Sequence, residues 1–423
     1  MDKIRRLFVR LSQWEYTGVI LLVLVLLALH LATIMRPPEL VFDEQFYVPS
    51  ARYILQGSGT DRIDHPPLGQ LLIASGLLLF GDNPFGWRFF PVIFGIIGLM
   101  LFYFICRQLK MPGRYAYLAT FLLSFENLSF VQSSVAMLDV FSLTFMMASL
   151  WFYLKNRYAC SGVMTGLAAL SKLTGALVIL IIILHWLITN RKRTANFMIL
   201  VVLAPATFFL LMPLLDFAVW HRWLNPLDQM ATMLDIGAGS TFAKYPSVML
   251  SRPWEWLFHP EILTYWAEPH YLAMISPPIW VLIIPAALFI VFKAFKGDSV
   301  AVFALIWFSG AYLVWIPASF ITDRISYVFY FYPAVGAVCL GLSLMTVNLD
   351  SIARNSSGSR YRRMLNMILP IYLLLCLGAF VILSPVSYWW KTPLSILAYV
   401  VARYRLSSSR TYGMPEKESV SGV

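Results

Sequence analysis

Long apolar runs separated by short polar segments extend along almost the whole chain. An α-helix needs about 20 apolar residues to cross roughly 30 Å of hydrocarbon, and several runs reach that length. The short alternating strands of an outer-membrane barrel are a different pattern. We therefore predict an all-α integral membrane protein with about eleven transmembrane helices. The expected spans are 16–35, 89–106, 115–129, 135–154, 159–170, 174–188, 195–215, 277–292, 300–320, 327–347 and 364–386.

The composition agrees with this pattern. Of 423 residues, 59% are hydrophobic and 13% are charged, and the mean hydropathy is +0.72. Soluble domains carry about 25% charged residues, so this composition excludes a water-exposed globular protein. The cysteines lie inside apolar stretches without a C-x-x-C spacing, which predicts packing roles rather than disulfides or a zinc site. They are Cys106, Cys160, Cys339 and Cys376.

The net charge of +11 raises the question of a nucleic-acid partner. Cytoplasmic loops of membrane proteins are enriched in Lys and Arg, and a cytoplasmic N-terminus places the basic clusters of this chain on that side. These clusters are the leader with Lys3, Arg5, Arg6 and Arg10, then 107–114, 155–157, 191–193, 293–296 and 354–363. Topology thus explains the charge, and we expect no nucleic-acid partner. The long polar loops 36–88 and 216–276 are expected outside the cell membrane.

The organisation of the chain follows from these spans. The first span is too long for a signal-peptide core, which favours a retained signal-anchor. The apolar run 68–80 is too short for a crossing, and counting it as one would invert every later basic loop. We therefore expect it to be an interfacial or re-entrant helix on the outer surface. One membrane domain over 1–406 is predicted, followed by a polar tail, 407–423.

Acidic side chains cluster just after the first span. Asp43 and Glu44 lie there as a pair, and Asp61, Asp64 and His65 follow. A carboxylate at a membrane boundary is costly to desolvate, so its pKa rises, which suits a general base near neutral pH. The alternative is a solvated loop whose acids do nothing. We favour that alternative for Asp61, and the functional interpretation for Asp43 and Glu44.

Basic side chains stand at the same predicted boundary. Arg88, Lys172, Arg252 and Arg324 each lie near the outer end of a span. For Arg88 the alternative is snorkelling, and the stretch around Arg252 has the composition of an interfacial aromatic belt. Two acids in or beside spans, Glu126 and Asp139, are functional candidates that could instead neutralise these cations. Together the cations could bind a lipid-borne phosphate while a carboxylate takes a proton from an incoming hydroxyl.

Several short motifs resemble one family of enzymes. The resemblance is to the polyprenyl- or dolichyl-phosphate-mannose protein O-mannosyltransferases, which are GT-C glycosyltransferases, and it extends from the first predicted span to the tenth. The second outer loop holds only about sixty residues, so the resemblance is to the small prokaryotic type. The motifs are Phe42-Asp43-Glu44, His65-Pro66-Pro67-Leu68-Gly69, Trp87-Arg88-Phe89-Phe90-Pro91, Leu138-Asp139, Ser171-Lys172, Ser251-Arg252-Pro253-Trp254 and Asp323-Arg324.

The resemblance implies a GT-C fold and a set of roles. Asp43 would be the general base, and Glu44 would bind the acceptor or shape the site. Arg88, Lys172 and Arg324 would hold the donor phosphate, and the remaining members of the expected binding set would line the site. These are His65, Asp64, Arg252 and Asp139. Transfer would invert the anomeric centre and need no metal or cofactor.

The resemblance also implies an activity. Mannose, or a related hexose, would pass from a polyprenyl or dolichyl phosphate to Ser or Thr hydroxyls of extracytoplasmic proteins; dimerisation is left open. Gln70 stands where many relatives have Lys, and Ser134 lies in a segment where an Arg is common, which leaves the sugar and acceptor undecided. One alternative is a lipid-directed sugar transferase of the aminoarabinose type, against which His65 argues. Another is a transporter, whose charges would lie at several depths.

Overall fold

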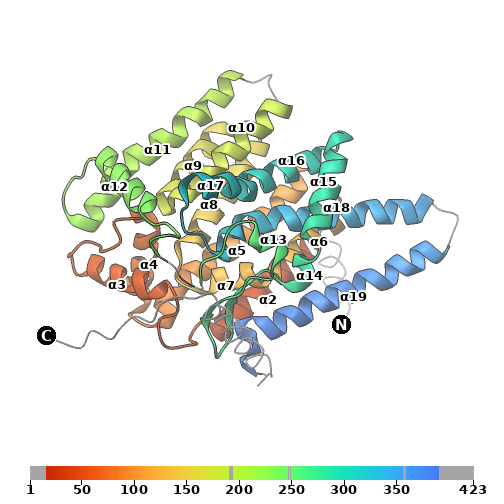
Figure 1. Cartoon of the computed structure of the whole chain (residues 1–423), viewed down its shortest axis with the longest axis horizontal. Coiled ribbons are helices and arrows are strands. Elements are labelled where there is room, and N and C mark those ends of the chain that lie inside the picture. Colours follow the sequence, from red (N-terminus) through yellow and green to blue (C-terminus); the bar gives the residue numbers. More distant parts are fainter. Residues whose placement is uncertain (1–15, 190–193, 246, 248, 356–358, 390–423) are drawn as a thin grey trace, which may run out of the picture.

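The structure is a computed structural model that describes residues 16–389, apart from 190–193, 246, 248 and 356–358. The basic leader, the cluster at 191–193 and the polar tail 407–423 lie outside the described residues. Helices pack side by side in one bundle, with α3 and α12 together at one end (Figure 1). The prediction of a helical membrane protein is confirmed, and a short two-stranded hairpin is added to it.

Most predicted spans coincide with helices. The first helix of the described chain is α2 (Thr17–Thr33), and it is followed by the first long loop. The later elements are α5 (Pro84–Gln108), α6 (Gly113–Ser124), α7 (Asn127–Ser134), α8 (Leu138–Leu154), α9 (Tyr158–Ser171), η1 (Leu173–Ala176), α10 (Leu177–Thr189), α11 (Thr194–Trp220), α14 (Pro277–Trp280), α15 (Ile283–Phe295), α16 (Ser299–Phe308), the π-helical η3 (Ser309–Leu313), α17 (Trp315–Thr322), η4 (Val328–Phe331), α18 (Tyr332–Asn355), α19 (Ser359–Leu383) and η5 (Pro385–Trp389).

Among the described residues, fewer helices than the eleven expected are both long enough and apolar enough to cross a membrane. Six helical stretches of the described chain are long and apolar enough to cross a membrane, and a seventh is added if α7 and α8 form one bent span. Four shorter apolar helices accompany them: α2, α4 (Pro67–Phe80), α9 and the stretch Leu173–Thr189. The multi-pass architecture is therefore supported, whereas the expected count of about eleven is not confirmed.

The predicted span 115–129 is wrong at its end, because the helix stops at Ser124. Glu126 caps the next helix instead, accepting hydrogen bonds from the N–H groups of Ser129 at 2.7 Å and Ser276 at 2.9 Å. The chain then bends by 114° between α7 and α8. Because the capping carboxylate satisfies two buried N–H groups, a break is stable where a hydrophobic run suggests a continuous helix. Glu126 therefore has a structural role as a helix cap.

Both long loops contain secondary structure: the helix expected over 68–80 is present as α4, and the other elements were not predicted. The first holds α3 (Glu44–Leu55) and α4, and α4 packs against α3, α5 and α9. The second holds α12 (Pro226–Ala238), α13 (Glu255–Phe258) and the antiparallel strands β1 (Leu263–Trp266) and β2 (Tyr271–Ala273). Asn225 starts α12 by accepting from the N–H of Leu227, with Pro226 in the first turn. These elements build the end of the bundle that carries the predicted site.

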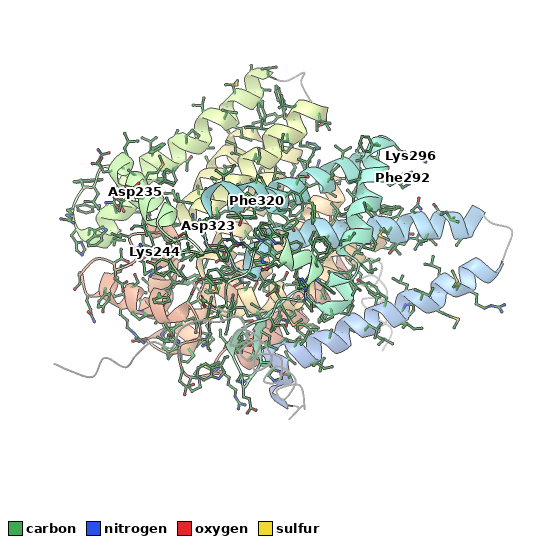
Figure 2. All side chains as sticks on the ribbon, in the orientation of Figure 1. Asp235, Lys244, Phe292, Lys296, Phe320 and Asp323 are labelled. Atoms are coloured by element: carbon green, nitrogen blue, oxygen red, sulfur yellow. The ribbon has the colours of Figure 1, made fainter. Side chains whose placement is uncertain are left out.

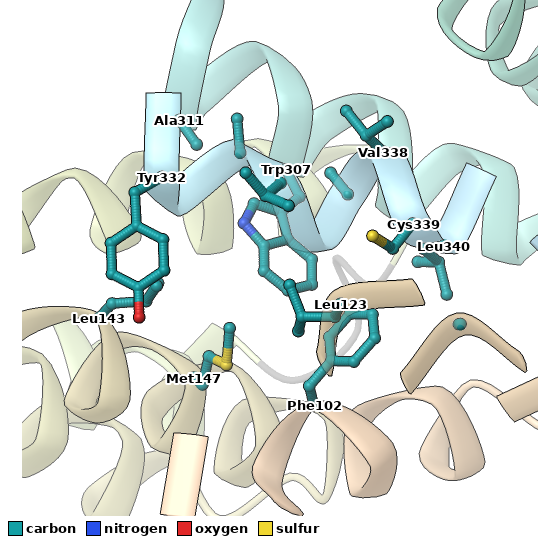
Figure 3. Close-up of a cluster of buried hydrophobic side chains, with 14 of the residues drawn as sticks. Phe102, Leu123, Leu143, Met147, Trp307, Ala311, Tyr332, Val338, Cys339 and Leu340 are labelled. Atoms are coloured by element: carbon teal, nitrogen blue, oxygen red, sulfur yellow. The ribbon is translucent and has the colours of Figure 1, made fainter. Parts of the chain in front are cut away.

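A dense aromatic core holds the helices in register. Trp307 on α16 packs against Phe102 on α5, with ring centroids 6.0 Å apart, and its indole N–H donates to the Pro333 carbonyl at 2.9 Å (Figure 3). Gly336 permits this approach, because a Cβ there would lie 2.9 Å from the Trp307 ring. Cys339 lies in the same cluster, and all four cysteines are free. The core thus provides a rigid base for the polar groups at the helix ends.

Candidate active site

A cavity of about 770 Å³ opens at the end of the bundle formed by α3, α12 and the ends of α10 and α17. Its polar walls come from the first long loop, the α9–η1 junction and the segment after α17. Its apolar wall comes from η1 and α10, and includes Leu177, Ile179 and Leu180. A cavity with a few charged groups at one side and an extended apolar wall fits an amphiphilic ligand.

Asp43 presents a free carboxylate to this cavity. It occupies the N-cap position of α3, where an Asp side chain normally accepts from backbone N–H groups, but it makes no capping bond. Backbone carbonyls accept from the first-turn N–H groups instead, as between Gln45 and Phe42 at 3.1 Å. Within the described part of the chain, no group donates a hydrogen bond to the Asp43 carboxylate. Its oxygens are therefore available to a substrate.

The backbone before Asp43 is held in an unusual conformation. Phe42 has a φ of 45°, which a bulky side chain adopts at a cost of the order of 1 kcal/mol or more. Its ring stacks on Tyr265 of β1 with centroids 4.3 Å apart, and also contacts Tyr327 and Phe329 edge-on. Packing against three rings offsets this strain. The strained residue thereby fixes the direction in which the neighbouring carboxylate points.

The surroundings of Asp43 tune its acidity. Burial raises the pKa of Asp43 to about 6, because the charged form loses hydration, while the nearby Lys172 ammonium acts in the opposite direction. His65 has the reverse response: burial lowers its pKa well below the ordinary value, and the surrounding cations lower it further. At neutral pH the site therefore contains a largely ionised Asp43 and a neutral His65.

Glu44 and Arg88 form a closed pair outside the cavity lining. The Arg88 guanidinium donates to both Glu44 carboxylate oxygens at 2.8 Å, and both side chains are fully buried. Glu44 also accepts from the N–H groups of Val41 at 3.0 Å and Ala136 at 2.9 Å. These bonds tie α3 to α5 and to the α7–α8 bend. Glu44 was expected to bind the acceptor or to shape the site, and Arg88 to hold the donor phosphate; neither side chain lines the cavity.

Lys172 reaches the cavity from the junction of α9 and η1. Its ammonium donates to both oxygens of Asp139 at 2.8 Å and lies over the rings of Phe329 and Tyr330. Asp139 itself stands behind Lys172 and does not line the cavity. A buried ammonium needs such a partner to stay charged, so Asp139 holds the position and charge of Lys172.

Arg324 follows α17 and lines the cavity without a partner. Its side chain makes no hydrogen bond or ion pair to any described residue, and its Nε is buried. Arg252 lies behind it rather than in the lining, donating to Asp323 at 2.6 Å and to Ser319 at 3.1 Å. A backbone bridge between Thr241 and Arg324 adds a second attachment. Arg252 therefore holds the segment that carries Arg324, and Arg324 is the cation left free for an anion.

The structure adds residues that sequence reasoning missed. Arg62 lines the cavity, donates to Asp64 at 2.8 Å and keeps a buried Nε without a partner. Tyr47 and Tyr327 also line it. An arginine in a polar loop and tyrosines at these positions have no distinguishing pattern, so only the fold identifies them. Five of the nine predicted site residues share this cavity: Asp43, Asp64, His65, Lys172 and Arg324.

The charges of the site occupy one end of the bundle. Lys244 and Asp323 lie toward α12, whereas Phe292 and Lys296 lie on the distant part of α15 (Figure 2). In the part of the chain that the structure describes, no group of three or more His, Cys, Asp or Glu side chains could hold a metal ion. A free carboxylate, a free guanidinium and a paired ammonium thus surround one space. Such a set can bind a phosphate and accept a proton beside it.

Part of the chain is similar in sequence to a known protein family. Residues 64–220 match the family described as dolichyl-phosphate-mannose-protein mannosyltransferase. That segment of the chain is similar in sequence to this family. The resemblance inferred from the motifs is confirmed there, and the segment contains Asp64, His65, Arg88, Asp139 and Lys172.

Curated relatives in the family match over a similar part. A polyprenol-phosphate-mannose–protein mannosyltransferase of Mycobacterium tuberculosis is 35% identical over 147 residues, which are 33% of this chain and 28% of that protein. One of Mycolicibacterium smegmatis is 37% identical over 115 residues, which are 26% of this chain and 22% of the relative. The matched region therefore spans less than a third of the length of these relatives.

Solved structures extend the similarity to the fold. The Saccharomyces cerevisiae protein O-mannosyltransferase Pmt1–Pmt2 complex bound to the sugar donor matches with a TM-score of 0.72 and 13% identity, over 88% of this chain and 90% of that one. ArnT from Cupriavidus metallidurans bound to undecaprenyl phosphate matches with a TM-score of 0.54 and 16% identity, over 86% and 76% of the two chains. The chain has the GT-C-like fold of these proteins.

Proposed function

We propose that this protein transfers mannose from a polyprenyl or dolichyl phosphate to a Ser or Thr hydroxyl of an acceptor protein. The observation that carries the proposal is one cavity in which the carboxylate of Asp43 and the guanidinium of Arg324 have no hydrogen-bond or ion-pair partner among the described residues. The family match of residues 64–220 supports the choice of donor and acceptor. The aminoarabinose-type alternative shares the fold, but the TM-score is higher for the protein mannosyltransferase.

The chemistry needs one base and a cationic phosphate site. The acceptor oxygen forms a bond to the anomeric carbon on the face opposite the phosphate, while the bond from that carbon to the phosphate oxygen breaks and its electrons leave with the phosphate. The hydroxyl proton passes to Asp43, whose pKa of about 6 leaves it ionised at neutral pH. Arg324, Lys172 and Arg62 stabilise the charge that develops on the leaving phosphate. The anomeric centre is inverted.

The apolar wall suits the lipid part of the donor. Leu177, Ile179, Leu180 and Trp315 line the cavity beyond the charged groups. Each buried methylene stabilises an aliphatic chain by about 0.8 kcal/mol, so even a short stretch of the polyprenyl chain adds affinity. In this proposal the phosphate lies at the charged end and the first isoprene units lie along α10.

We also propose the membrane arrangement that the charge pattern predicts. The six long spans, the bent α7–α8 pair and the shorter α2, α9 and η1–α10 would be crossings, and α6 with the residues that follow it would be the eleventh. The N-terminus would be cytoplasmic, and the cavity would face the outside of the cell membrane. A cysteine accessibility scan of the loops tests this sidedness, with Lys296 and Lys244 as positions expected on opposite sides.

One transfer assay tests the proposed activity. Purified protein is incubated with radiolabelled polyprenyl-phosphate-mannose and a Ser/Thr-rich peptide, and label on the peptide is counted. We expect transfer by the wild type, loss of at least about 100-fold for Asp43→Asn, and retained donor binding in that variant. Asp61→Asn is the matched control, because this acid lies in the same loop but is exposed. Label on lipid in place of peptide would support the aminoarabinose-type alternative, and turnover by Asp43→Asn at the wild-type rate would overturn the role of Asp43.

A further inference from the structure

The amide of Gln70, in the first turn of α4, is buried and fully hydrogen-bonded. Its oxygen accepts from the hydroxyls of Ser50 at 2.9 Å and Thr60 at 2.6 Å. Its nitrogen donates to the carbonyls of Arg62 at 3.0 Å and His65 at 3.3 Å. A primary amide has two donor and two acceptor positions, and here all four are used. A buried amide whose hydrogen-bonding positions are all used indicates that Gln70 has a specific structural role.

The groups that Gln70 holds form one wall of the cavity. The strip 60–65 carries Arg62, Asp64 and His65, all of which line the cavity. The strip is not helical, and among the described residues its own backbone contributes one long hydrogen bond, from the His65 N–H to the Arg62 carbonyl at 3.4 Å. Thr60 extends the network, because its hydroxyl contacts Ser50 and accepts from the Arg62 N–H at 3.0 Å. Side-chain hydrogen bonds centred on Gln70 therefore hold the strip 60–65 in position.

The start of α4, which carries Gln70, is fixed relative to Lys172. Gly69 packs so closely that a Cβ there would lie 2.7 Å from Leu138 and 2.9 Å from the Ser171 carbonyl. Ser171 directly precedes Lys172. The start of α4 is thus locked against the segment that carries the ammonium. Through its bond to the Arg62 carbonyl, Gln70 links that fixed position to the strip that carries Arg62.

We propose that Gln70 is a positioning residue that sets the affinity of the cavity for the donor phosphate by fixing the strip 60–65 and, with it, Arg62. This rests on the proposed function, since it assumes that the cavity binds a polyprenyl phosphate. Gln70 does not line the cavity and touches no substrate. Its effect is on the distance between two cationic walls, which governs how well both reach one phosphate.

Gln70→Ala removes all four bonds, and the test has a binding arm and a kinetic arm. We expect the Kd for polyprenyl phosphate and the donor KM to rise about tenfold, which is about 1.4 kcal/mol, with kcat changed less than about threefold. Gln45→Ala is the control, since Gln45 is exposed on α3. A donor Kd and KM equal to the wild type would overturn the proposal. The binding measurement uses polyprenyl phosphate alone, so it tests the role of Gln70 even if no acceptor is modified. Wild-type protein without transfer activity would count against the proposed function only.

A double-mutant cycle separates positioning from general destabilisation. If Gln70 acts through Arg62, adding Gln70→Ala to Arg62→Ala should raise the donor KM by less than about twofold more. Fully additive effects would contradict the proposal. If Gln70→Ala does not yield folded protein, Gln70→Glu keeps the acceptor oxygen but faces the two carbonyls with a second oxygen. Its donor KM should fall toward the wild-type value as acid protonates it, and a donor KM equal to the wild type at every pH would overturn the proposal.

Discussion

Replacing Arg88 by Met should destabilise the protein without directly weakening donor binding. The guanidinium makes five hydrogen bonds in a fully buried position, two to Glu44 and three to the backbone carbonyls of Ile34, Pro37 and Glu39. Its removal leaves the Glu44 carboxylate buried without a counter-charge. Breaking a buried ion pair in this way costs about 3–5 kcal/mol. The expected result is a large loss in the free energy of unfolding.

The assay compares thermal stability and donor binding in detergent. Arg52→Met is the matched control, because the Arg52–Asp82 pair is on the surface, with side chains 36% and 48% exposed, and such pairs contribute about 0–1 kcal/mol. The double variant Arg88→Met/Glu44→Gln should lose less than the sum of the two single variants. An Arg88→Met protein as stable as the wild type but with weakened donor binding would refute this reasoning. It would support a role for Arg88 in binding the donor phosphate.

Two further predictions concern the free cation of the cavity. Arg324→Gln removes a guanidinium without a partner among the described residues, so stability should be unchanged while the donor KM rises about tenfold to a hundredfold, as expected for lost charged hydrogen bonds; a normal donor KM would contradict this role. Gly237→Ala places a Cβ about 3.0 Å from the Arg324 guanidinium while giving α12 a better helix former, so donor affinity should fall as thermal stability holds or rises, and a fall in stability alone would count against the mechanism.

The sequence predicted the parts of this protein that depend on local pattern. Long apolar runs give helices wherever no competing cap intervenes, so most of the expected helices were found. Asp43 and Lys172 were found because an acid beside a span and a lone cation at its outer end are costly unless they are used. The structure brings both residues to the cavity.

The parts that were missed depend on partners far away in the sequence. The end of α6 depends on Glu126 meeting Ser276, 150 positions later. The burial of Arg88 depends on α3 folding back so that Glu44, 44 positions earlier, reaches its guanidinium. Whether a basic residue faces a cavity or a carboxylate is decided by such tertiary contacts, and hydropathy carries no information about them.

The pH dependence of transfer tests the central claim most directly. Burial raises the pKa of Asp43 to about 6, and a general base acts only when deprotonated, so kcat/KM should rise through pH 6 and level off above about pH 7. Below pH 6 the rate should fall about tenfold per unit. Asp61→Asn should keep this profile, and the residual activity of Asp43→Asn should lack the rise near pH 6. An unchanged profile in Asp43→Asn would contradict the account.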